Sequence, residues 1–353
     1  MATIVIAIII DVFGFGPFVQ KVLTNPNYTP YSSNQSTIQL YYYLTKSINT
    51  SRNHTTCSDQ IVIVDVGQLS RKQTADVINK ISIGNAVIVG LDVRFGDTIE
   101  TYSDSLLVES IINCKNIVLP YGIDELHGNK KVGSFFDEII KNKKMGFTNL
   151  YDSYNRFCSF IVIDDTTCVS FPYIIATEYA TKKSLTIRHQ LNDLPFINFS
   201  KRDFSIIDGI DYLSKNDSDF DNKIALLGCV YDSRDSHKTY AGELPGVLIN
   251  AFAIDTILNN RFVKEVSKTI CWLIAFFIIF VFSSFSLLFR PQKKIHLILS
   301  KIVELIMMFV VVFAGAILFY GKDIYIDIMP YFISIFVYLG ISLIYSRIIK
   351  NRK

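Results

Sequence analysis

The chain has 353 residues, of which 50% are hydrophobic and only 19% are charged, with a formal net charge of +3. This composition excludes a disordered chain, a collagen and a coiled coil, and the small net charge provides no basic face for nucleic acid. The hydrophobic residues are concentrated near the two ends, which indicates membrane segments around a more polar module.

The first apolar segment, Ala2–Gln20, is interrupted by Asp11 and Pro17. It has no basic residues before its apolar stretch, and no clear Ala-x-Ala cleavage site follows it. We therefore predict an uncleaved signal anchor, a membrane helix over residues 1–21.

Residues 22–268 form a module of ordinary polarity that is long enough for a substantial core. Short apolar runs, which predict strands, alternate there with patterns of helical period. The predicted strands are Gln60–Val66, Ala86–Val93, Asn116–Pro120, Cys158–Ile163, Leu194–Phe199 and Lys223–Val230. The predicted helices are Ile38–Ile48, Lys72–Ser82, Asp104–Asn113, Phe135–Lys141 and Gly246–Asn259.

Strands that are apolar on both faces and alternate with helices favour a mostly parallel sheet. The predicted fold class is therefore α/β, an extracytoplasmic domain with helices on both faces of a mostly parallel sheet, joined to an all-α membrane region. No Gly/Ser linker lies between Phe262 and Thr269, so a movement of the module could pass to the helix that follows.

Three further apolar segments follow the module. Residues 269–289 and 328–346 carry no charge, and each is long enough to cross about 30 Å of hydrocarbon as a helix. The segment between them, residues 295–320, carries Lys301 and Glu304 in its first third. This pair can be interfacial, with Lys301 reaching the headgroups, or it can be a functional pair within the membrane.

The distribution of basic residues predicts the orientation of these segments. The turn at residues 290–294 and the tail at residues 347–353 are rich in Lys and Arg and contain no acid, whereas residues 321–327 are balanced. Positive charge favours the cytoplasmic side, so the turn and the tail are predicted there and residues 22–268 outside. The expected location is the inner (plasma) membrane, as a multi-pass protein.

Five cysteines lie in the predicted extracytoplasmic module, and their spacing shows no disulfide framework. Cys158 and Cys168 bracket a possible hairpin and could pair, whereas Cys114 and Cys229 are better explained as buried thiols. Cys57 is the fifth.

Acidic residues follow several predicted strands, at the edge where open α/β sheets bind ligands. Asp65 and Asp92 end the first two strands, and Asp232, Asp235 and His237 lie in the loop after Lys223–Val230. Several carboxylate oxygens at one point would suit a hard metal ion or a polar ligand, and the sequence does not say which.

The same acids also have a structural explanation, as helix caps or as partners of Arg71, Arg94 and Arg156, and a pair of Arg71 with Asp65 is left open. The sequence contains no Walker loop, no Gly-x-Ser-x-Gly elbow, no His-Glu-x-x-His and no Gly-x-Gly-x-x-Gly after a strand. We therefore expect no enzymatic activity and no cofactor.

Several segments occur in the order that a known family shows. IVIVDVGQLSR ends in Ser70 and Arg71, and AVIVGLDVRF precedes a helix that begins at Asp104. The short segment GFTN ends in Asn149 and is followed by Arg156.

Two later segments are the most specific. KIALLGCVYDSRDSHKT contains Gly228 and the loop acids, and LPGVLINAFAIDTIL contains Pro245 and Gly246. Together the segments resemble the CHASE2 extracytoplasmic sensory domain of bacterial transmembrane receptors over about residues 59–262, with Asn250 where that family often has histidine.

The resemblance implies a sensor that recognises an unidentified small-molecule ligand or stimulus and relays it through its membrane helices. The candidate ligand-binding residues are Asp65, Ser70, Arg71, Asp92, Asp104, Asn149, Arg156, Asp232, Asp235 and His237, and the structural ones are Gly228, Pro245 and Gly246.

No output domain follows in this sequence, so the implied partners are a separate effector protein or a homo-oligomer, besides the lipid bilayer, and not nucleic acid. Two other functions stay open. One is an extracytoplasmic metal-assisted enzyme that uses the strand-end carboxylates, and the other is a structural subunit of an envelope complex.

Overall fold

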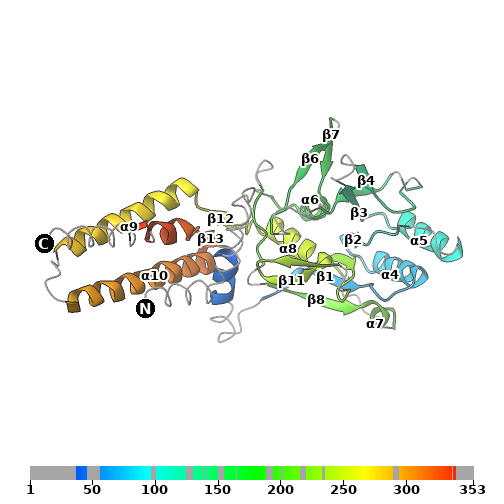
Figure 1. The fold of residues 1–353 in the computed structure, drawn as a ribbon. Coiled ribbons are helices and arrows are strands. Elements are labelled where there is room, and N and C mark those ends of the chain that lie inside the picture. Colours follow the sequence, from blue (N-terminus) through cyan, green and yellow to red (C-terminus); the bar gives the residue numbers. More distant parts are fainter. Residues whose placement is uncertain are drawn as a thin grey trace. The chain divides into compact units, whose positions relative to one another are not determined.

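The computed structural model divides the chain into two compact units, Asn53–Val263 and Met1–Arg52 with Lys264–Lys353 (Figure 1). The structure describes residues 37–45, 56–96, 101–124, 130–137, 139–140, 142–149, 155–163, 165–187, 194–199, 202–214, 220–232, 235–288, 294–335 and 337–338.

A seven-stranded sheet forms the centre of Asn53–Val263, in the order β4-β3-β2-β9-β1-β8, with β5 also paired to β3. Its strands are β1 (Thr56–Asp65), β2 (Ile88–Asp92), β3 (Ile117–Asp124), β4 (Lys130–Val132), β5 (Lys144–Phe147), β8 (Arg202–Asp208) and β9 (Ile224–Gly228). Among these strands, the pairing of β3 with β4 is antiparallel and the others are parallel. The mixed α/β architecture with a mostly parallel central sheet confirms this part of the predicted fold class.

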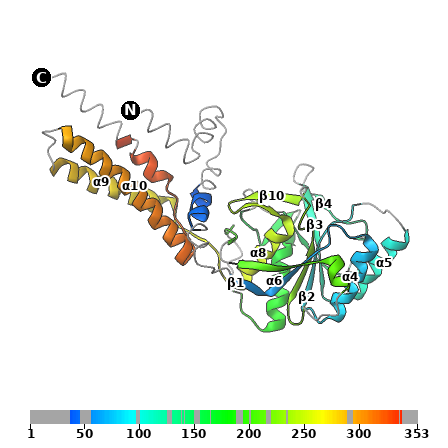
Figure 2. The ribbon, with the colours of Figure 1, turned by 90° about the horizontal axis from the view of Figure 1, so that it is seen from below.

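Helices cover both faces of the sheet, as Figure 2 shows. One face carries α4 (Arg71–Ile83), α5 (Thr101–Asn113) and α7 (Gly209–Ser214), and the other carries α6 (Phe171–Lys183) and α8 (Gly246–Leu258). Alternate strand residues such as Val64, Leu91 and Leu227 pack with the first set of helices in one buried cluster.

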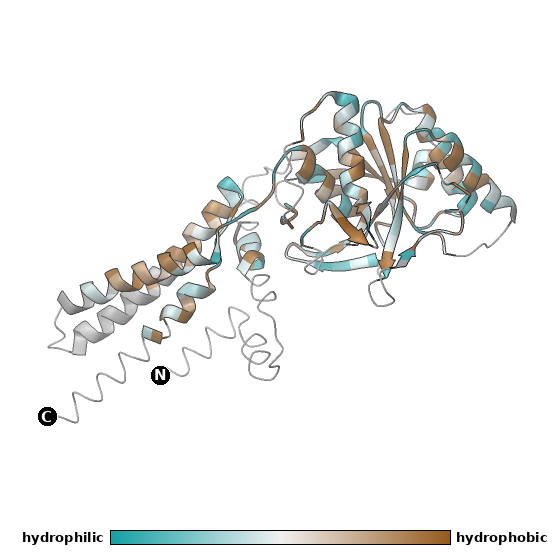
Figure 3. Ribbon diagram, turned by 90° about the horizontal axis from the view of Figure 1, so that it is seen from above, coloured by the Kyte–Doolittle hydropathy of each residue, from teal (hydrophilic) through white to brown (hydrophobic). Residues whose placement is uncertain are grey.

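The central strands consist of apolar residues because both of their faces are covered. Val64, Leu91 and Leu227 have no exposed surface, and the ribbon of these strands is mostly brown in Figure 3. Two antiparallel hairpins flank the sheet, β6 (Phe160–Ile163) with β7 (Thr166–Val169) and β10 (Ser236–Thr239) with β11 (Gly242–Pro245). The second hairpin leads directly into α8.

Two of the predicted elements are wrong. The described residues of 135–141 form turns instead of a helix, with the amides of Ile139 and Ile140 both bonded to the carbonyl of Phe136. Residues 194–199 form isolated bridges through Phe196 instead of a strand. The backbone amides of this segment donate to side chains instead of to a neighbouring strand. The Asn198 amide donates to Thr256 Oγ1, and the Phe199 amide donates to Tyr240 Oη.

The cysteines of the chain are free thiols. The disulfide between Cys158 and Cys168 that the sequence left open is not formed, and the Cys158 thiol instead donates to the carbonyl of Phe160, 2.9 Å away. Cys114 is fully buried, whereas Cys229 is partly exposed.

The second unit contains α9 (Lys268–Leu288), α10 (Lys294–Lys322), a helix at residues 37–45 and helical turns at 329–335. The short strand β12 (Lys264–Glu265) pairs in parallel with β13 (Ile324–Tyr325). The helix at 37–45 is anchored by Tyr41, whose ring packs on Phe319 and whose hydroxyl donates to the Ile326 carbonyl at 3.1 Å.

Large apolar side chains are exposed on α9 and α10, among them Leu273 (63%), Phe280 (67%) and Phe309 (56%). No helix among the described residues combines the length and the apolar character that crossing a membrane requires. The spans at 269–289, 295–320 and 328–346 stay predictions. The signal anchor at 1–21 and the basic tail at 347–353 lie outside the described residues.

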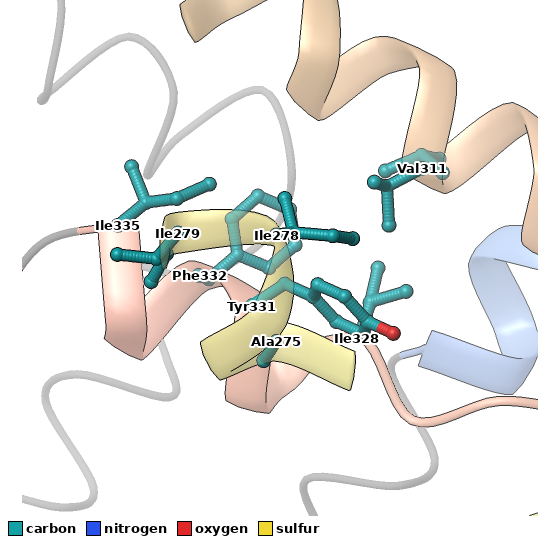
Figure 4. A pocket seen from close by; sticks show the side chains of 9 residues that line it. Ala275, Ile278, Ile279, Val311, Ile328, Tyr331, Phe332 and Ile335 are labelled. Atoms are coloured by element: carbon teal, nitrogen blue, oxygen red, sulfur yellow. The ribbon is translucent and has the colours of Figure 1, made fainter. Parts of the chain in front are cut away.

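A small cavity lies between α9, α10 and the residues that follow β13 (Figure 4). Its volume is about 30 Å³, comparable with the space of a single water. The lining is apolar apart from one tyrosine: Ala275, Ile278, Ile279, Val311, Val312, Ile328, Tyr331, Phe332 and Ile335. A cavity of this size and chemistry is not a candidate for a polar ligand.

Candidate functional site

A cleft of about 590 Å³ opens at the carboxyl ends of β2, β3 and β9. This is the edge at which open α/β sheets bind their ligands, and the volume suits a small molecule. The lining is largely polar and consists of Asp92, Val93, Arg94, Pro120, Gly122, Ile123, Asp124, Val132, Thr148, Asn149, Cys229, Asp235, His237, Gly246 and Asn250.

Three strand ends lie in register at this edge of the sheet. Gly228 of β9 pairs with Asp65 of β1 on one side and with Asp92 of β2 on the other. A side chain at Gly228 has no room, because an added Cβ would lie 2.6 Å from the Cβ of Val247 on α8. The predicted structural role of Gly228 is therefore the close approach of α8 to the sheet.

This close approach lets Asn250 of α8 reach Asp92, with its Nδ2 donating to Oδ2 at 2.8 Å. Burial raises the pKa of Asp92 to about 7, against the lowering effects of the Asn250 hydrogen bond and of Arg94. Asn250 is only 3% exposed, and its Oδ1 accepts no hydrogen bond from the described residues. The wall of the cleft thus contains a buried acceptor that has no donor.

Asp235 lies at the N-terminus of α8. An added Cβ on Gly246, the first residue of the helix, would lie 2.8 Å from Asp235 Oδ2, so the glycine leaves room for the carboxylate. A negative charge at this end of a helix is stabilised by the helix dipole. His237 Nε2 lies 3.1 Å from Asp235 Oδ1, and Pro245 is the extended residue that precedes the helix.

The negative charges of four of the predicted acids all act on one thiol, that of Cys229. Burial and, after it, the negative charges of Asp235, Asp65, Asp232 and Asp92 together raise the pKa of this thiol to about 11. Among the described residues, no group of three or more His, Cys, Asp or Glu side chains is arranged to hold a metal ion.

Asp65 does not line the cleft, although it ends the strand beside Gly228. Its Oδ1 accepts hydrogen bonds from the amides of Gly67, at 3.1 Å, and Val230, at 3.0 Å. Asp65 is 6% exposed, and its carboxylate holds these two loops in place. This is the structural role that the sequence left as the alternative.

Ser70, Arg71 and Asp104 also lie outside the cleft lining. Ser70 caps α4 in a capping box with Gln73. Arg71 forms an ion pair with Asp104 of α5, and its guanidinium lies over the ring of Phe135 at 4.9 Å. The pair of Arg71 with Asp65 that the sequence left open is not formed, because Arg71 pairs with Asp104 and Asp65 accepts from backbone amides.

Asn149 lines the cleft, but both ends of its amide are bonded to β3. Its Oδ1 accepts from the Ile123 amide at 2.7 Å, and its Nδ2 donates to the Ile123 carbonyl at 2.8 Å. Arg156 lies elsewhere, with Nη1 donating to the Leu194 carbonyl at 2.7 Å and the guanidinium 3.6 Å from the centre of the Phe196 ring.

Among the lining residues that were not predicted as ligand-binding are Arg94, Asp124 and Asn250. Arg94 and Asp124 come at or just after the ends of β2 and β3, where the strand-end rule that selected Asp92 could have found them. Arg94 is exposed, forms no ion pair with the described residues, and its Nη1 lies against Gly122 of β3. Asn250 is a polar residue within an otherwise apolar stretch of α8.

The fold and the cleft define an α/β domain with a polar site at the carboxyl edge of its sheet. The family model of the CHASE2 domain matches residues 39–289, more than half of the chain, so the chain belongs to the CHASE2 domain family. CHASE2 domains are extracellular sensory domains. Neither a curated protein nor a solved structure matches the chain.

Proposed function

We propose that this chain is a membrane-anchored extracytoplasmic sensory protein whose cleft binds a small ligand. The observation that carries the proposal is the polar cleft of about 590 Å³ at the carboxyl edge of the sheet, with a buried acceptor in its wall. Membership of a family of extracellular sensory domains supports it.

The proposed role is binding and not catalysis. The thiol in the cleft, Cys229, stays protonated near neutral pH because its pKa is raised to about 11. A protonated thiol is a poor nucleophile. His237 lies beside Asp235, where it can take part in holding a polar ligand.

The membrane part of the proposal is supported by the exposed apolar side chains of α9 and α10. Exposed groups of this kind often mark contact with a membrane or with another protein. We propose membrane helices at 1–21, 269–289, 295–320 and 328–346 in the inner (plasma) membrane. The basic residues at 290–294 and 347–353 then place the C-terminus in the cytoplasm.

The proposed relay follows from how the chain joins its two units. Val263 is bridged to Phe196 in one unit, and the next residue, Lys264, pairs with Ile324 in the other. Since α8 borders the cleft and precedes this junction, a ligand that moves α8 would change the force on Val263. The relay would then act on a separate effector protein or on a second copy of the chain.

Cysteine labelling in intact cells tests the proposed arrangement. A membrane-impermeant maleimide should label the exposed Cys57 without permeabilisation. A cysteine placed in the tail by Lys353→Cys should react only after permeabilisation. Labelling of the tail in intact cells, or protection of Cys57, would contradict the proposed topology.

A further inference from the structure

Resting on the proposed ligand-binding role of the cleft, we propose that its ligand is a small zwitterion of the amino-acid class, with a primary ammonium group and a carboxylate. The first argument is the carboxamide of Asn250. Its Nδ2 is held by Asp92, so the amide cannot turn without losing that hydrogen bond, and its Oδ1 is left without a donor. An ammonium group supplies N–H donors, which a buried acceptor requires.

The charges of the cleft favour a cationic group near Asn250 and Asp92. Three carboxyl groups line it, those of Asp92, Asp124 and Asp235, against one guanidinium and the imidazole of His237. An ammonium group near Asp92 and Asp235 would be stabilised by them, whereas an anion would be repelled. A simple anion is therefore a poor candidate for the whole ligand.

Arg94 favours a negatively charged group in the ligand. Its guanidinium is exposed on the cleft wall and forms no ion pair with the described residues. The planar guanidinium matches a carboxylate with two parallel hydrogen bonds, which makes this pairing strong and directional. A ligand carboxylate would pair with Arg94.

A ligand with both groups satisfies both requirements at once. An amine alone would leave Arg94 unpaired, and a carboxylate alone would leave Asn250 Oδ1 without a donor. The cleft of about 590 Å³ has room for an amino acid with a side chain.

Titration calorimetry on the purified full chain tests the proposal. The probes are the common α-amino acids, γ-aminobutyrate and ε-aminocaproate, with n-butylamine and butyrate as half-molecules. At least one zwitterion should bind, and each half-molecule should bind at least roughly tenfold more weakly, since a charge-assisted hydrogen bond contributes about that much.

Variants of Arg94 and Asn250 assign the two ends of the bound zwitterion, and a variant of Lys72 is the control. Arg94→Gln should weaken the zwitterion by roughly tenfold to a hundredfold and leave n-butylamine unchanged, since it removes the partner of the carboxylate only. Asn250→Leu should weaken both compounds, and Asn250→Ser serves if the leucine variant melts early. Lys72→Gln, which removes an exposed positive charge on α4 outside the cleft lining, should change neither.

Three results would overturn the inference, two of them concerning relative affinities. One is n-butylamine or butyrate binding as tightly as the best zwitterion, and the other is an unchanged zwitterion affinity in Arg94→Gln. Absence of binding by every zwitterion would also overturn it. None of these results bears on the labelling of Cys57 and the tail, so a wrong ligand class is distinguishable from a wrong topology.

Discussion

Asn250 of α8 donates a hydrogen bond to Asp92 at the end of β2, with 2.8 Å between Nδ2 and Oδ2. The contact joins the helix that borders the cleft to the sheet at its base. Burial raises the pKa of Asp92 to about 7, so the contact involves a group whose charge changes near neutral pH. The joint between helix and sheet is therefore sensitive to pH without any ligand.

The first prediction is a loss of stability as the pH rises through the pKa of Asp92. The carboxyl group has a pKa of 3.8 in a model peptide and about 7 in the fold, so folding favours its protonated form. This stabilisation is complete below 3.8 and is lost as the pH rises to about 7. Asp92→Asn cannot ionise at this position. Its free energy of unfolding, measured with denaturant, should therefore increase relative to that of the natural chain as the pH rises across this range.

The control for this prediction is Asp76→Asn, which removes an exposed carboxylate on α4. Its free energy of unfolding should follow that of the natural chain at every pH. If Asp92→Asn and Asp76→Asn depend on pH in the same way, Asp92 does not control the stability of this joint.

The central strands could be predicted because their residues are apolar on both faces. The runs Gln60–Val66, Ala86–Val93 and Lys223–Val230 correspond to β1, β2 and β9. The strand β8 (Arg202–Asp208) was not predicted, because it lies at the edge of the sheet and carries charge at both ends. The helix α6 (Phe171–Lys183) was missed as well, and its N-cap, Ser170, makes no side-chain capping bond.

The wrong strand at 194–199 has a cause that local sequence does not reveal. Its amides at Asn198 and Phe199 are taken by the side chains of Thr256 and Tyr240, which lie 58 and 41 residues further along the chain. Tertiary contacts of this kind override the strand preference of an apolar run.

The position of the candidate site could be predicted from the sequence, but the residues that form it could not. Parallel strands end at one edge, so acids at their ends were expected there, and Asp92 and Asp235 do line the cleft. Asp65 does not, because nearby loop amides bind its carboxylate. Asn250 carried a usable signal as a polar residue between the fully buried Ile249 and Ala251.

The second prediction concerns the ion pair of Arg71 with Asp104, whose side chains are 11% and 7% exposed. Removing one partner leaves the other charge buried without this ion pair. Arg71→Leu or Asp104→Leu should therefore lower the free energy of unfolding by about 3 kcal/mol. The double variant should lose much less than the sum of the two, as measured by denaturant unfolding.

A second cycle with Asp65→Asn and Arg71→Leu is the matched control, since these residues have different partners. Their effects on stability should add. Strong coupling between Arg71 and Asp65 would mean that the guanidinium pairs with Asp65 after all.

The third prediction is that Gly246→Ala destabilises the domain by about 1 kcal/mol, the low end of the cost of a group without room, because the end of the Asp235 side chain can shift. The cause is the carboxylate of Asp235, 2.8 Å from an added Cβ, so Asp235→Ala should recover most of the loss. Gly96→Ala is the control, because an added Cβ at Gly96 meets nothing within 4 Å. The effect is measured by thermal melting of Gly246→Ala, Asp235→Ala, the double variant of these two, and Gly96→Ala. If the effects of Gly246→Ala and Asp235→Ala simply add in the double variant, the two groups do not clash.

The fourth prediction concerns the reactivity of the Cys229 thiol. Because its pKa is raised to about 11, only roughly one thousandth of it is ionised at about pH 8, and the thiolate is the form that is alkylated. Iodoacetamide should therefore modify the exposed Cys57 much faster than Cys229. Peptide mass spectrometry over a time course separates the two sites.

Asp235→Asn should accelerate the modification of Cys229, because burial is the largest cause of the raised pKa and the Asp235 charge is the next. The reaction at Cys57 in the same sample is the internal reference and should keep its rate. The matched variant Asp76→Asn removes an exposed carboxylate of α4 that is not among the charges acting on this thiol, and it should change neither rate. Equal rates at Cys229 in the natural chain and in Asp235→Asn would show that the Asp235 charge does not act on the thiol.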